Sequence, residues 1–518
     1  MNGAQALIRT LVACGVDVCF TNPGTSEMHF VAALDDVPEM RAVLALYEGV
    51  ATGAADGYAR MADRPAATLL HLGPGLGNGI ANLHNARRAR TPVVNIVGDH
   101  ATYHRAHDAP LGSDIEALAR NVSSWIRDTA RPDDVVRDAI EAVHAAMGPP
   151  GQVATLILPA DTSWLEAGDP AGGPVSVTPR EVSSDVVDVV AKAIRSGEPA
   201  ALLLGGAALR ERGLVAAGRV GAAAGVKVLC ETFPARQERG AGLPAPERLG
   251  YFAEFAVAQL QGVRHLVLVG AKAPVSFFAY PGKPSSLVPD DCEVHVLAAE
   301  GDDAPLALAH LADALGASAD AAVCAPAARP ARPTGVLNAQ AIGDAVGAVL
   351  PEGAIVADEA NTNGLFVPGA TTGAPRHDWL TLTGGAIGLG LPLATGAAIA
   401  CPDRKVLCLE ADGSAMYTLQ ALWTQAREGL DVTTVLFDNR SYAILNIELG
   451  RVGAGAGGPR AHALLDLSDP DLDFVALARG MGVDATRPAS AEELTDALER
   501  AFEEPGPHLI DVPLPAKL

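Results

Sequence analysis

The chain has 518 residues, 49% of them hydrophobic and 54 of them glycine, so it is too long for one ordinary domain and suits large buried sheets. Its 61 acidic and 38 basic residues give a net charge of −23, which argues against binding to nucleic acid or anionic membranes. The start of the chain lacks a basic region followed by an apolar segment, and no apolar run is long enough to span a bilayer. The seven cysteines have no CxxC or zinc-ligand spacing, which indicates buried thiols in a reducing cytosol. We therefore expect a soluble, cytoplasmic protein.

The first part of the chain alternates short apolar runs with helical patterns. Residues 17–20 predict a strand, and residues 22–27 predict a turn that starts a helix. A second strand, at 41–47, delivers Glu48 to the start of a helix over 49–61. Taken alone, a glutamate at such a junction usually complements the helix dipole at the surface.

A third strand ends in a glycine-rich loop. Residues 67–72 predict the strand, and residues 73–78 predict a loop that opens a helix. The Gly-x-Gly-x-x-Gly spacing is absent, so the loop is only weak evidence for nucleotide binding. His71 has two interpretations, a core histidine bonded to a carbonyl or a proton-transfer group.

Two linkers divide the chain. Residues 168–179 are rich in glycine and proline, and residues 317–333 are rich in alanine and proline. Between them, apolar runs at 200–204, 226–230 and 265–269 predict strands of another doubly wound sheet.

Two strand ends organise the last part of the chain. Residues 405–409 predict a buried strand shortly before Asp412, and residues 432–437 predict a second strand shortly before Asn439. Both side chains therefore leave the carboxyl ends of neighbouring strands, where parallel α/β sheets bind ligands. Gly413 lets the backbone approach a phosphate, and the helix that follows offers free N–H groups.

Oxygen ligands are available at these strand ends. The Asp412 carboxylate, the Asn439 amide and a main-chain carbonyl near Ser441 would suit a hard cation such as Mg²⁺, with diphosphate oxygens and water completing an octahedron. A lone Asp-Gly pair would instead be an ordinary capped corner between a strand and a helix.

The spacing of these groups resembles a known motif. Asp412 and Asn439 are 27 residues apart, as in the thiamin diphosphate motif, where Gly-Asp-Gly is followed about that far on by Asn-Asn. Ala411 replaces the first glycine and Asp438 the first asparagine, but neither position carries the ligand in the family. The segment 48–60 resembles the family segment that carries the cofactor-activating glutamate. Over nearly its whole length, the chain resembles thiamin diphosphate-dependent enzymes of the acetolactate synthase and benzoylformate decarboxylase type.

The resemblance implies an α/β protein of three doubly wound parallel-sheet domains. We expect a pyrimidine-binding domain at 1–165, a central domain at 184–325 and a diphosphate-binding domain at 334–518. The family forms its active site between two subunits, so the resemblance also implies a homodimer or homotetramer.

The resemblance assigns roles to individual residues. Glu48 would face N1′ of the cofactor's aminopyrimidine and promote loss of the C2 proton of the thiazolium. Gly385 would bond the aminopyrimidine through its carbonyl, and Ile387 would hold the cofactor in its bent shape, with helix packing as the other interpretation of Ile387. The implied cofactor-binding residues are Asn361, Thr362, Gly385, Ile387, Asp412, Gly413, Ser414 and Asn439. The implied magnesium ligands come from Asp412, Asn439 and Ser441.

Two positions favour the decarboxylase branch. His71 and Thr25 match the catalytic histidine and the substrate-contacting serine of benzoylformate decarboxylase. After Gly270, the charged segment that accompanies FAD in acetolactate synthases is missing, so FAD is not expected. Phe277 and Phe278 stand where benzoylformate decarboxylase supplies a second catalytic histidine, either as an apolar pocket wall or as core.

The implied reaction is decarboxylation of a 2-oxo acid through an enamine, which is released as an aldehyde or ligated to a second carbonyl. Carboligation of pyruvate, as in acetolactate synthase, is the alternative within the class. A catalytically silent, cofactor-binding partner subunit would agree with Ala411 and Asp438, but the retained Glu48 argues against it. An FAD-containing oxidase or synthase is a further alternative.

Overall fold

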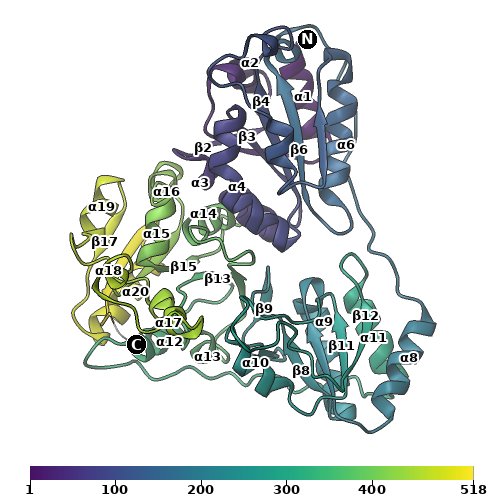
Figure 1. The fold of residues 1–518 in the computed structure, drawn as a ribbon, viewed down its shortest axis with the longest axis vertical. Helices are drawn as coiled ribbons and strands as arrows, with labels where there is room; N and C mark the ends of the chain where they lie inside the picture. Colours follow the sequence, from purple (N-terminus) through teal and green to yellow (C-terminus); the bar gives the residue numbers. More distant parts are fainter. Residues whose placement is uncertain (517–518) are drawn as a thin grey trace.

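The computed structural model of the protein describes residues 1–516 and contains three sheets in which parallel pairing dominates, each flanked by helices (Figure 1). In Figure 1 the first sheet lies at the top, and the other two lie side by side below it. This arrangement confirms the predicted fold class of three doubly wound α/β units. Within residues 1–516, no helix is both long and apolar enough to cross a membrane.

The first sheet has six strands in the order β2-β1-β3-β4-β6-β5, all paired in parallel. Its strands are β1 (Val18–Thr21), β2 (Arg41–Leu44), β3 (Ala66–Leu70), β4 (Val93–Asp99), β5 (Trp125–Asp128) and β6 (Val153–Pro159). Its helices are α1 (Gly3–Ala13), α2 (Met28–Ala33), α3 (Glu48–Ala62), α4 (Leu72–Ala89), α5 (Ile115–Ala119), α6 (Val135–Met147) and α7 (Ala160–Trp164). Helices α1 and α6 share a buried cluster with one face of the sheet, and α3 and α4 pack on the other. The predicted glycine-rich loop at 73–78 is wrong in one respect, because it forms the first turns of α4 rather than a loop before it.

The central sheet has five strands in the order β10-β8-β7-β11-β12. They are β7 (Ala200–Leu204), β8 (Lys227–Cys230), β10 (Glu247–Arg248), β11 (His265–Val269) and β12 (Glu293–Ala298). The helices are α8 (Ser184–Arg195), α9 (Glu211–Ala224), α10 (Ala253–Leu260) and α11 (Ala304–Ala314). Helices α8, α9 and α11 pack on one face, and α10 packs on the other.

The third sheet has seven strands in the order β17-β18-β16-β15-β13-β14-β9. They are β9 (Gln237–Arg239), β13 (Ile355–Glu359), β14 (His377–Thr381), β15 (Val406–Ala411), β16 (Val432–Asp438), β17 (Asp484–Thr486) and β18 (His508–Pro513). The helices are α12 (Ala339–Val349), α13 (Val367–Ala370), α14 (Gly390–Ala400), α15 (Asp412–Thr418), α16 (Ala421–Glu428), α17 (Ala443–Arg451), α18 (Pro459–Ala463), α19 (Phe474–Gly480) and α20 (Ala491–Glu503). Strand β9 belongs by sequence to the central part of the chain, yet it pairs antiparallel with β14 at the edge of this sheet.

Helices α3 and α14 hold the first and third parts of the chain together. A Cβ on Gly57 would lie 2.0 Å from the Leu393 carbonyl oxygen, and one on Gly396 would lie 1.8 Å from the Ala54 carbonyl oxygen. The two backbones therefore approach so closely that only glycine fits at these crossing points. The close approach brings the start of α3 near the turn before α14, and both segments were predicted to hold the cofactor.

Candidate active site

The two ends of the predicted diphosphate motif meet in the structure. Asp412 begins α15 directly after β15, and Asn439 directly follows the neighbouring strand β16. The Asp412 side chain is buried, and it accepts hydrogen bonds from the Gly413 N–H at 2.8 Å and the Arg440 N–H at 2.5 Å. The carboxylate thus joins its own turn to the turn after β16, as the spacing of the two motifs predicts.

The amide of Asn439 is fixed by a neighbouring asparagine. Its Nδ2 donates to Asn363 Oδ1 at 2.6 Å, and its Oδ1 accepts from the Ser441 N–H at 2.9 Å. The Ser441 hydroxyl donates to the Leu465 carbonyl at 3.2 Å, so it is engaged away from the motif. The residue before Asn439 adds a second acid, because Asp438 is buried and its Oδ1 has no hydrogen-bond partner.

The charge at this site suits a divalent cation. Burial, and next the negative charge of Asp412, raise the pKa of Asp438 to about 6. Two buried carboxylates beside an amide oxygen form an all-oxygen donor set, which is what Mg²⁺ prefers. The residues present therefore fit a magnesium ion, with Asp412, Asn439 and Ser441 as the predicted ligands.

A second pair of predicted residues comes together beside the motif. Asn361 adopts a left-handed backbone with φ of 50° after β13, and its Nδ2 donates to Ser414 Oγ at 3.2 Å. Thr362 follows directly and is half-buried. Positive φ in an asparagine is uncommon and often marks a functional turn. The turn and the first residues of α15 together present the small polar groups and free N–H groups that diphosphate binding needs.

The turn before α14 is built on a glutamate that the sequence analysis did not single out. Glu359 accepts hydrogen bonds from the N–H groups of Gly388 at 2.8 Å and Leu389 at 2.7 Å, and also from that of Gly390. This turn contains Gly385, with φ of 73°, and the half-buried Ile387. The Glu359 carboxylate therefore sets the shape of the segment predicted to hold the aminopyrimidine.

A buried acid lies beside Glu359. Glu410 pairs in register with it on the next strand, and both side chains are buried. Burial raises the pKa of Glu359 to about 7. Burial, and next the charge of Glu359, raise the pKa of Glu410 well above its usual range. The sequence signal was present, since an acid within an apolar strand is rarely buried without a reason.

The predicted pyrimidine-side residues gather at the start of α3 and α4. Glu48 is the first residue of α3 and is 8% exposed, and its carboxylate accepts a hydrogen bond from Asn78 Nδ2 at 3.0 Å. A Cβ on Gly75 would lie 3.3 Å from Glu48 Oε1 and 3.4 Å from the His71 Cβ. Glu48 and His71 therefore both lie close to Gly75.

His71 is paired with an acid that the sequence analysis missed. Its Nδ1 lies 2.8 Å from Glu27 Oε2, which also accepts the Gly24 N–H at 2.7 Å. Burial raises the pKa of Glu27, while the neighbouring His71 acts to lower it. Thr25 begins the short 3₁₀ turn that contains Glu27 and is exposed. The core interpretation of His71, a bond to a carbonyl, is wrong, because its partner is a carboxylate.

An aromatic side chain from the central part reaches the third sheet. The Phe277 ring occupies the space beside Gly385, where a Cβ would lie 2.6 Å from the ring. Phe277 packs 5.8 Å from Phe233 and 5.2 Å from Tyr251 between ring centroids. This places an aromatic cluster next to the turn predicted to hold the aminopyrimidine.

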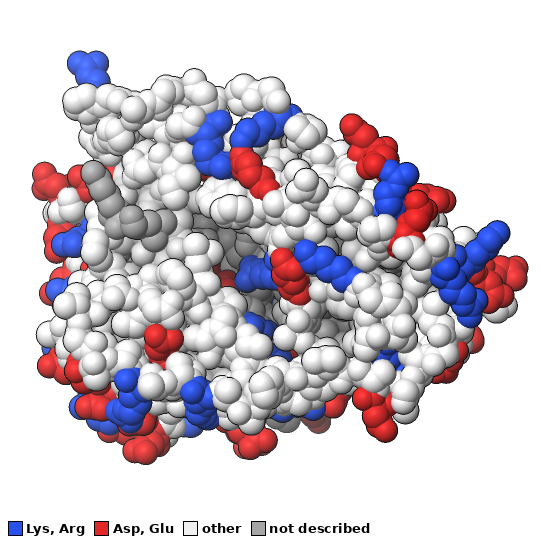
Figure 2. All heavy atoms as spheres, turned by 90° about the horizontal axis from the view of Figure 1, so that it is seen from below, with Lys and Arg blue, Asp and Glu red and all other residues white. Residues whose placement is uncertain are grey.

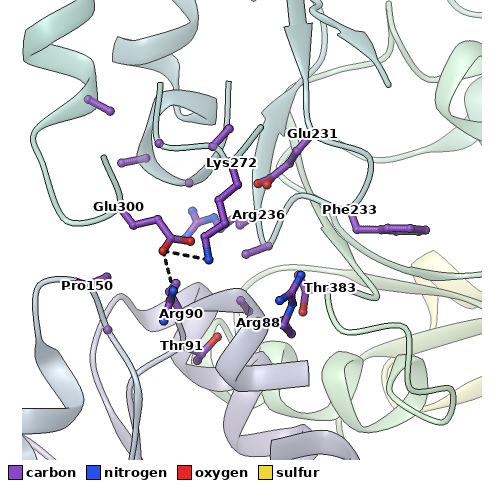
Figure 3. A pocket seen from close by; sticks show the side chains of 18 of the residues that line it. Arg88, Arg90, Thr91, Pro150, Glu231, Phe233, Arg236, Lys272, Glu300 and Thr383 are labelled. Carbon is purple, nitrogen blue, oxygen red and sulfur yellow. Dashed lines mark hydrogen bonds and ion pairs between the residues drawn. The ribbon is translucent and has the colours of Figure 1, made fainter. Parts of the chain in front are cut away.

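A large cavity lies apart from Glu48 and Asp412 but is lined by the aromatic cluster of Phe233, Tyr251 and Phe277. Its volume is about 1290 Å³, and it opens where the three parts of the chain meet (Figure 3). Arg88, Arg90 and Lys272 line it, and Glu300 pairs with Arg90 at 2.6 Å and with Lys272 at 3.6 Å. Figure 2 shows the underside of the molecule, which is hollowed near its middle, with basic side chains at the hollow and side chains of both charges around the outer margin. Neither Glu48 nor Asp412 lines the cavity, so its size does not make it the predicted catalytic site.

Three parallel sheets in this order, with an acid and an amide at the strand ends of the last, are features of thiamin diphosphate-dependent enzymes. The chain belongs to the thiamine pyrophosphate enzyme family: residues 1–118 match its N-terminal TPP binding domain and residues 369–512 match its C-terminal TPP binding domain. The predicted family is confirmed, and the protein is a thiamin diphosphate-dependent enzyme of the decarboxylase or acetolactate synthase type.

Two relatives in sequence represent the two branches of that group, one each. The chain is 63% identical to the "Putative acetolactate synthase large subunit IlvX" of Mycobacterium tuberculosis, over 100% of this chain and 99% of the relative. It is 31% identical to the benzoylformate decarboxylase of Pseudomonas aeruginosa, over 96% of each chain.

Two solved structures share the fold over nearly the full length. The thiamine diphosphate-dependent 4-hydroxybenzoylformate decarboxylase of Rhodococcus jostii superposes with a TM-score of 0.86 at 25% identity, covering 99% of each chain. Benzoylformate decarboxylase from Polynucleobacter necessarius superposes with a TM-score of 0.84 at 23% identity, covering 100% of this chain and 99% of the other.

Proposed function

We propose that the protein is a magnesium- and thiamin diphosphate-dependent decarboxylase of a 2-oxo acid with an apolar or aromatic side chain. The observation that carries this proposal is the Glu27–His71 pair, which, like Glu48, lies close to Gly75. Bound thiamin diphosphate would supply an electron-accepting thiazolium to the keto carbon of the substrate.

Glu48 serves as the proton-holding group at the aminopyrimidine. It is almost fully buried, and Asn78 orients its carboxylate from α4 of the same domain. A carboxyl group oriented in this way can share a proton with a ring nitrogen of the bound cofactor. This role explains why an acid stands at the start of α3, where a surface interpretation would require exposure.

His71 serves as the proton-transfer group next to the reacting carbon. Glu27 accepts at Nδ1 of His71, so this nitrogen carries the hydrogen and Nε2 is left for substrate. The His71 side chain is 22% exposed, so it is open on one side, while the Glu27 side chain is 1% exposed and held in place. The arrangement of an imidazole oriented by a buried carboxylate is a recurring device for general acid–base catalysis.

The aromatic cluster supports an apolar substrate. Phe277 is held against Gly385 by ring contacts with Phe233 and Tyr251. Side chains of this kind bury large apolar area and favour a substrate whose side chain is apolar or aromatic. We interpret Phe277 as a wall of the substrate pocket. Thr25 remains the residue whose hydroxyl is predicted to contact the substrate.

The active site is completed by a second subunit. The described hydrogen bonds of Glu48 stay within the first domain, and large apolar side chains are exposed beside both groups of residues. These are Leu46, Met416, Tyr417 and Leu445. Large apolar side chains left exposed beside a site are suited to an interface. We therefore propose a cytoplasmic homodimer or homotetramer in which Glu48 of one subunit faces Asp412 and Asn439 of its partner.

Carboligation of pyruvate is the second candidate function. It is supported by the name of the relative that is 63% identical along the whole chain. The two candidates differ in what happens after carbon dioxide leaves, which is release of an aldehyde in one and attack on a second carbonyl in the other.

The test is carbon dioxide release combined with NMR of the products. The protein is reconstituted with thiamin diphosphate and Mg²⁺ and given benzoylformate or pyruvate separately, with Glu48→Gln as the control. Benzaldehyde from benzoylformate would support the proposal, and acetolactate from pyruvate would overturn it in favour of carboligation. Cofactor binding without release from either acid, in protein that is otherwise folded, would favour the silent partner subunit.

A further inference from the structure

Two histidines and a glutamate converge at the amino ends of the last two strands of the central sheet. His265 Nδ1 lies 3.1 Å from His295 Nε2, and Glu293 Oε2 lies 3.8 Å from each of these nitrogens. His265 and Glu293 are register partners on β11 and β12, and Glu293 and His295 are two residues apart, so all three side chains leave the same face. His265 is 8% exposed and His295 is 9% exposed, while Glu293 is mostly exposed.

The distances match the coordination shell of a small divalent transition metal. A tetrahedral zinc ion with Zn–N distances of about 2.0–2.1 Å holds its ligand atoms ~3.3 Å apart. The triangle of 3.1, 3.8 and 3.8 Å therefore needs only small side-chain adjustments to enclose such an ion. Two imidazoles with one carboxylate favour zinc over magnesium or calcium, which prefer oxygen ligands.

A carboxylate behind His265 is placed to set its tautomer. Glu198 Oε2 lies 3.2 Å from His265 Nε2, and Ser196 Oγ lies 3.4 Å from the same nitrogen. When Nε2–H donates to Glu198, the lone pair of His265 is at Nδ1, which points at His295 and Glu293. Metal-binding histidines usually donate their other ring nitrogen to such a carboxylate. Arg264 lies 3.8 Å from the other Glu198 oxygen and also pairs with Asp291, so it balances charge outside the triangle.

A hydrogen bond between two neutral imidazoles is the simpler explanation of the short His265–His295 distance. It accounts for that pair alone. It does not explain why a third donor lies equally far from both nitrogens, or why a fourth group occupies the far nitrogen of His265.

We propose that His265, Glu293 and His295 form a binding site for Zn²⁺ or a divalent ion of similar chemistry, with water in the remaining position. The site would clip β11 to the edge strand β12. The chain between these two strands carries Phe277, the proposed wall of the substrate pocket, so the ion would stabilise the base of that connection. An ion that binds only the folded chain raises its stability.

The test uses the full-length enzyme saturated with thiamin diphosphate and Mg²⁺, so that the oxygen site is filled. Protein that has been treated with a chelator is dialysed against a slight excess of Zn²⁺. The bound zinc per chain is then measured by elemental mass spectrometry. His295→Gln and Glu293→Gln are compared with wild type, and Glu293→Gln guards against misfolding because this side chain is exposed. His508→Gln is the matched control, because Asp484, Glu504 and His508 form the other group of three possible ligands in the described residues.

We expect wild type and His508→Gln to bind one more zinc per chain than His295→Gln. We expect Glu293→Gln to bind this zinc at least tenfold more weakly than wild type. Zinc should also raise the melting temperature of wild type by about 2–4 °C and leave that of His295→Gln unchanged. Equal zinc content in wild type, His295→Gln and Glu293→Gln would overturn the proposal. Loss of zinc in His508→Gln alone would place the ion at the other group.

Discussion

In both the central and the third sheet, polar residues follow the carboxyl ends of parallel strands, but the chemistry of these residues differs between the two sheets. In the third sheet, the strand ends of β15 and β16 carry Asp412 and Asn439, which are tied together through the Arg440 N–H. In the central sheet, the corresponding edge carries Glu231 after β8, facing basic side chains of the first domain across the cavity of Figure 3. Burial raises the pKa of Glu231 to about 7.

The difference shows that a parallel sheet provides the location of a site without providing its chemistry. An acid and an amide one strand apart offer the oxygen ligands that we propose for a cation and a diphosphate. Glu231 lies in a wide cavity that is also lined by Glu300 and by arginines, and the carboxylate–amide pair of the third sheet has no counterpart in that lining. The predictions below test this contrast, from the largest expected effect to the smallest.

The largest effect is expected from the strand-end acid of the third sheet. Asp412→Ala removes the carboxylate that joins the two turns of the motif, so we expect magnesium-dependent cofactor binding to be lost and turnover with it. Glu231→Gln, at the comparable edge of the central sheet, should leave cofactor binding unchanged. Titration of each variant with thiamin diphosphate by near-ultraviolet circular dichroism would decide; equal affinities would contradict the contrast.

Glu48→Gln should lower turnover by about 10²–10⁴-fold while the cofactor stays bound, because the amide cannot hold or share a proton as the acid does. Exchange of the C2 proton of bound cofactor, followed by NMR, separates this effect from loss of binding. Asn78→Ala is a milder companion variant, since it removes only the hydrogen bond that orients Glu48. Unchanged C2 exchange in Glu48→Gln would return Glu48 to a structural role.

His71→Ala should lower turnover of a 2-oxo acid by ~10²-fold, the usual scale for a proton-transfer group. Glu27→Gln should have a smaller effect, which falls on kcat more than on KM, because it removes the carboxylate that orients the His71 imidazole. A purely structural role for Glu27 would change stability without lowering kcat.

The buried acids of the third sheet should make stability depend on pH. The raised pKa of Glu359, about 7 against 4.5, means that its contribution is fully present below about pH 4.5 and is lost as the pH rises through 7. Glu410→Gln removes the neighbouring acid. The free energy of unfolding of this variant should therefore fall less steeply with pH than that of wild type, by up to ~1.4 kcal/mol per pH unit. Urea unfolding at pH 5, 6 and 7 would measure the two slopes, and parallel slopes would contradict the coupling.

The smallest effect is expected in the central sheet. We predict that purified protein lacks flavin absorbance and that added FAD does not change turnover, because the charged segment that follows Gly270 in flavin-binding relatives is absent. A yellow protein, or activation by FAD, would show that the cavity holds a flavin despite that absence.

The sequence was sufficient for the fold class and for the strand ends that carry Asp412 and Asn439, because both depend on local apolar periodicity followed by polar turns. It also placed Glu48 at the start of α3, where the structure has it. Contacts between distant segments could not be predicted in the same way. The pairing of Glu27 with His71 joins residues 44 apart, and the contact of Phe277 with Gly385 joins two domains.

Boundaries and local shape were also harder to predict than the presence of an element. The single helix expected after Gly413 is two helices, since α15 ends at Thr418 and α16 begins at Ala421. Glu359 could not be identified as the residue that shapes the turn before α14, because its three N–H partners lie 29 to 31 residues away along the chain.

The edge strand β9 limits how the third sheet could be separated from the rest of the chain, by fragmentation or in evolution. It is donated by the middle of the chain to the third sheet, where Arg239 pairs with His377. A fragment containing only the last part of the chain would therefore leave β14 with unpaired backbone groups along one side. Such an exposed edge can form hydrogen bonds with a second copy of the fragment. The third sheet is thus not a movable module, and transplanting it into another protein would require a substitute strand or a blocked edge.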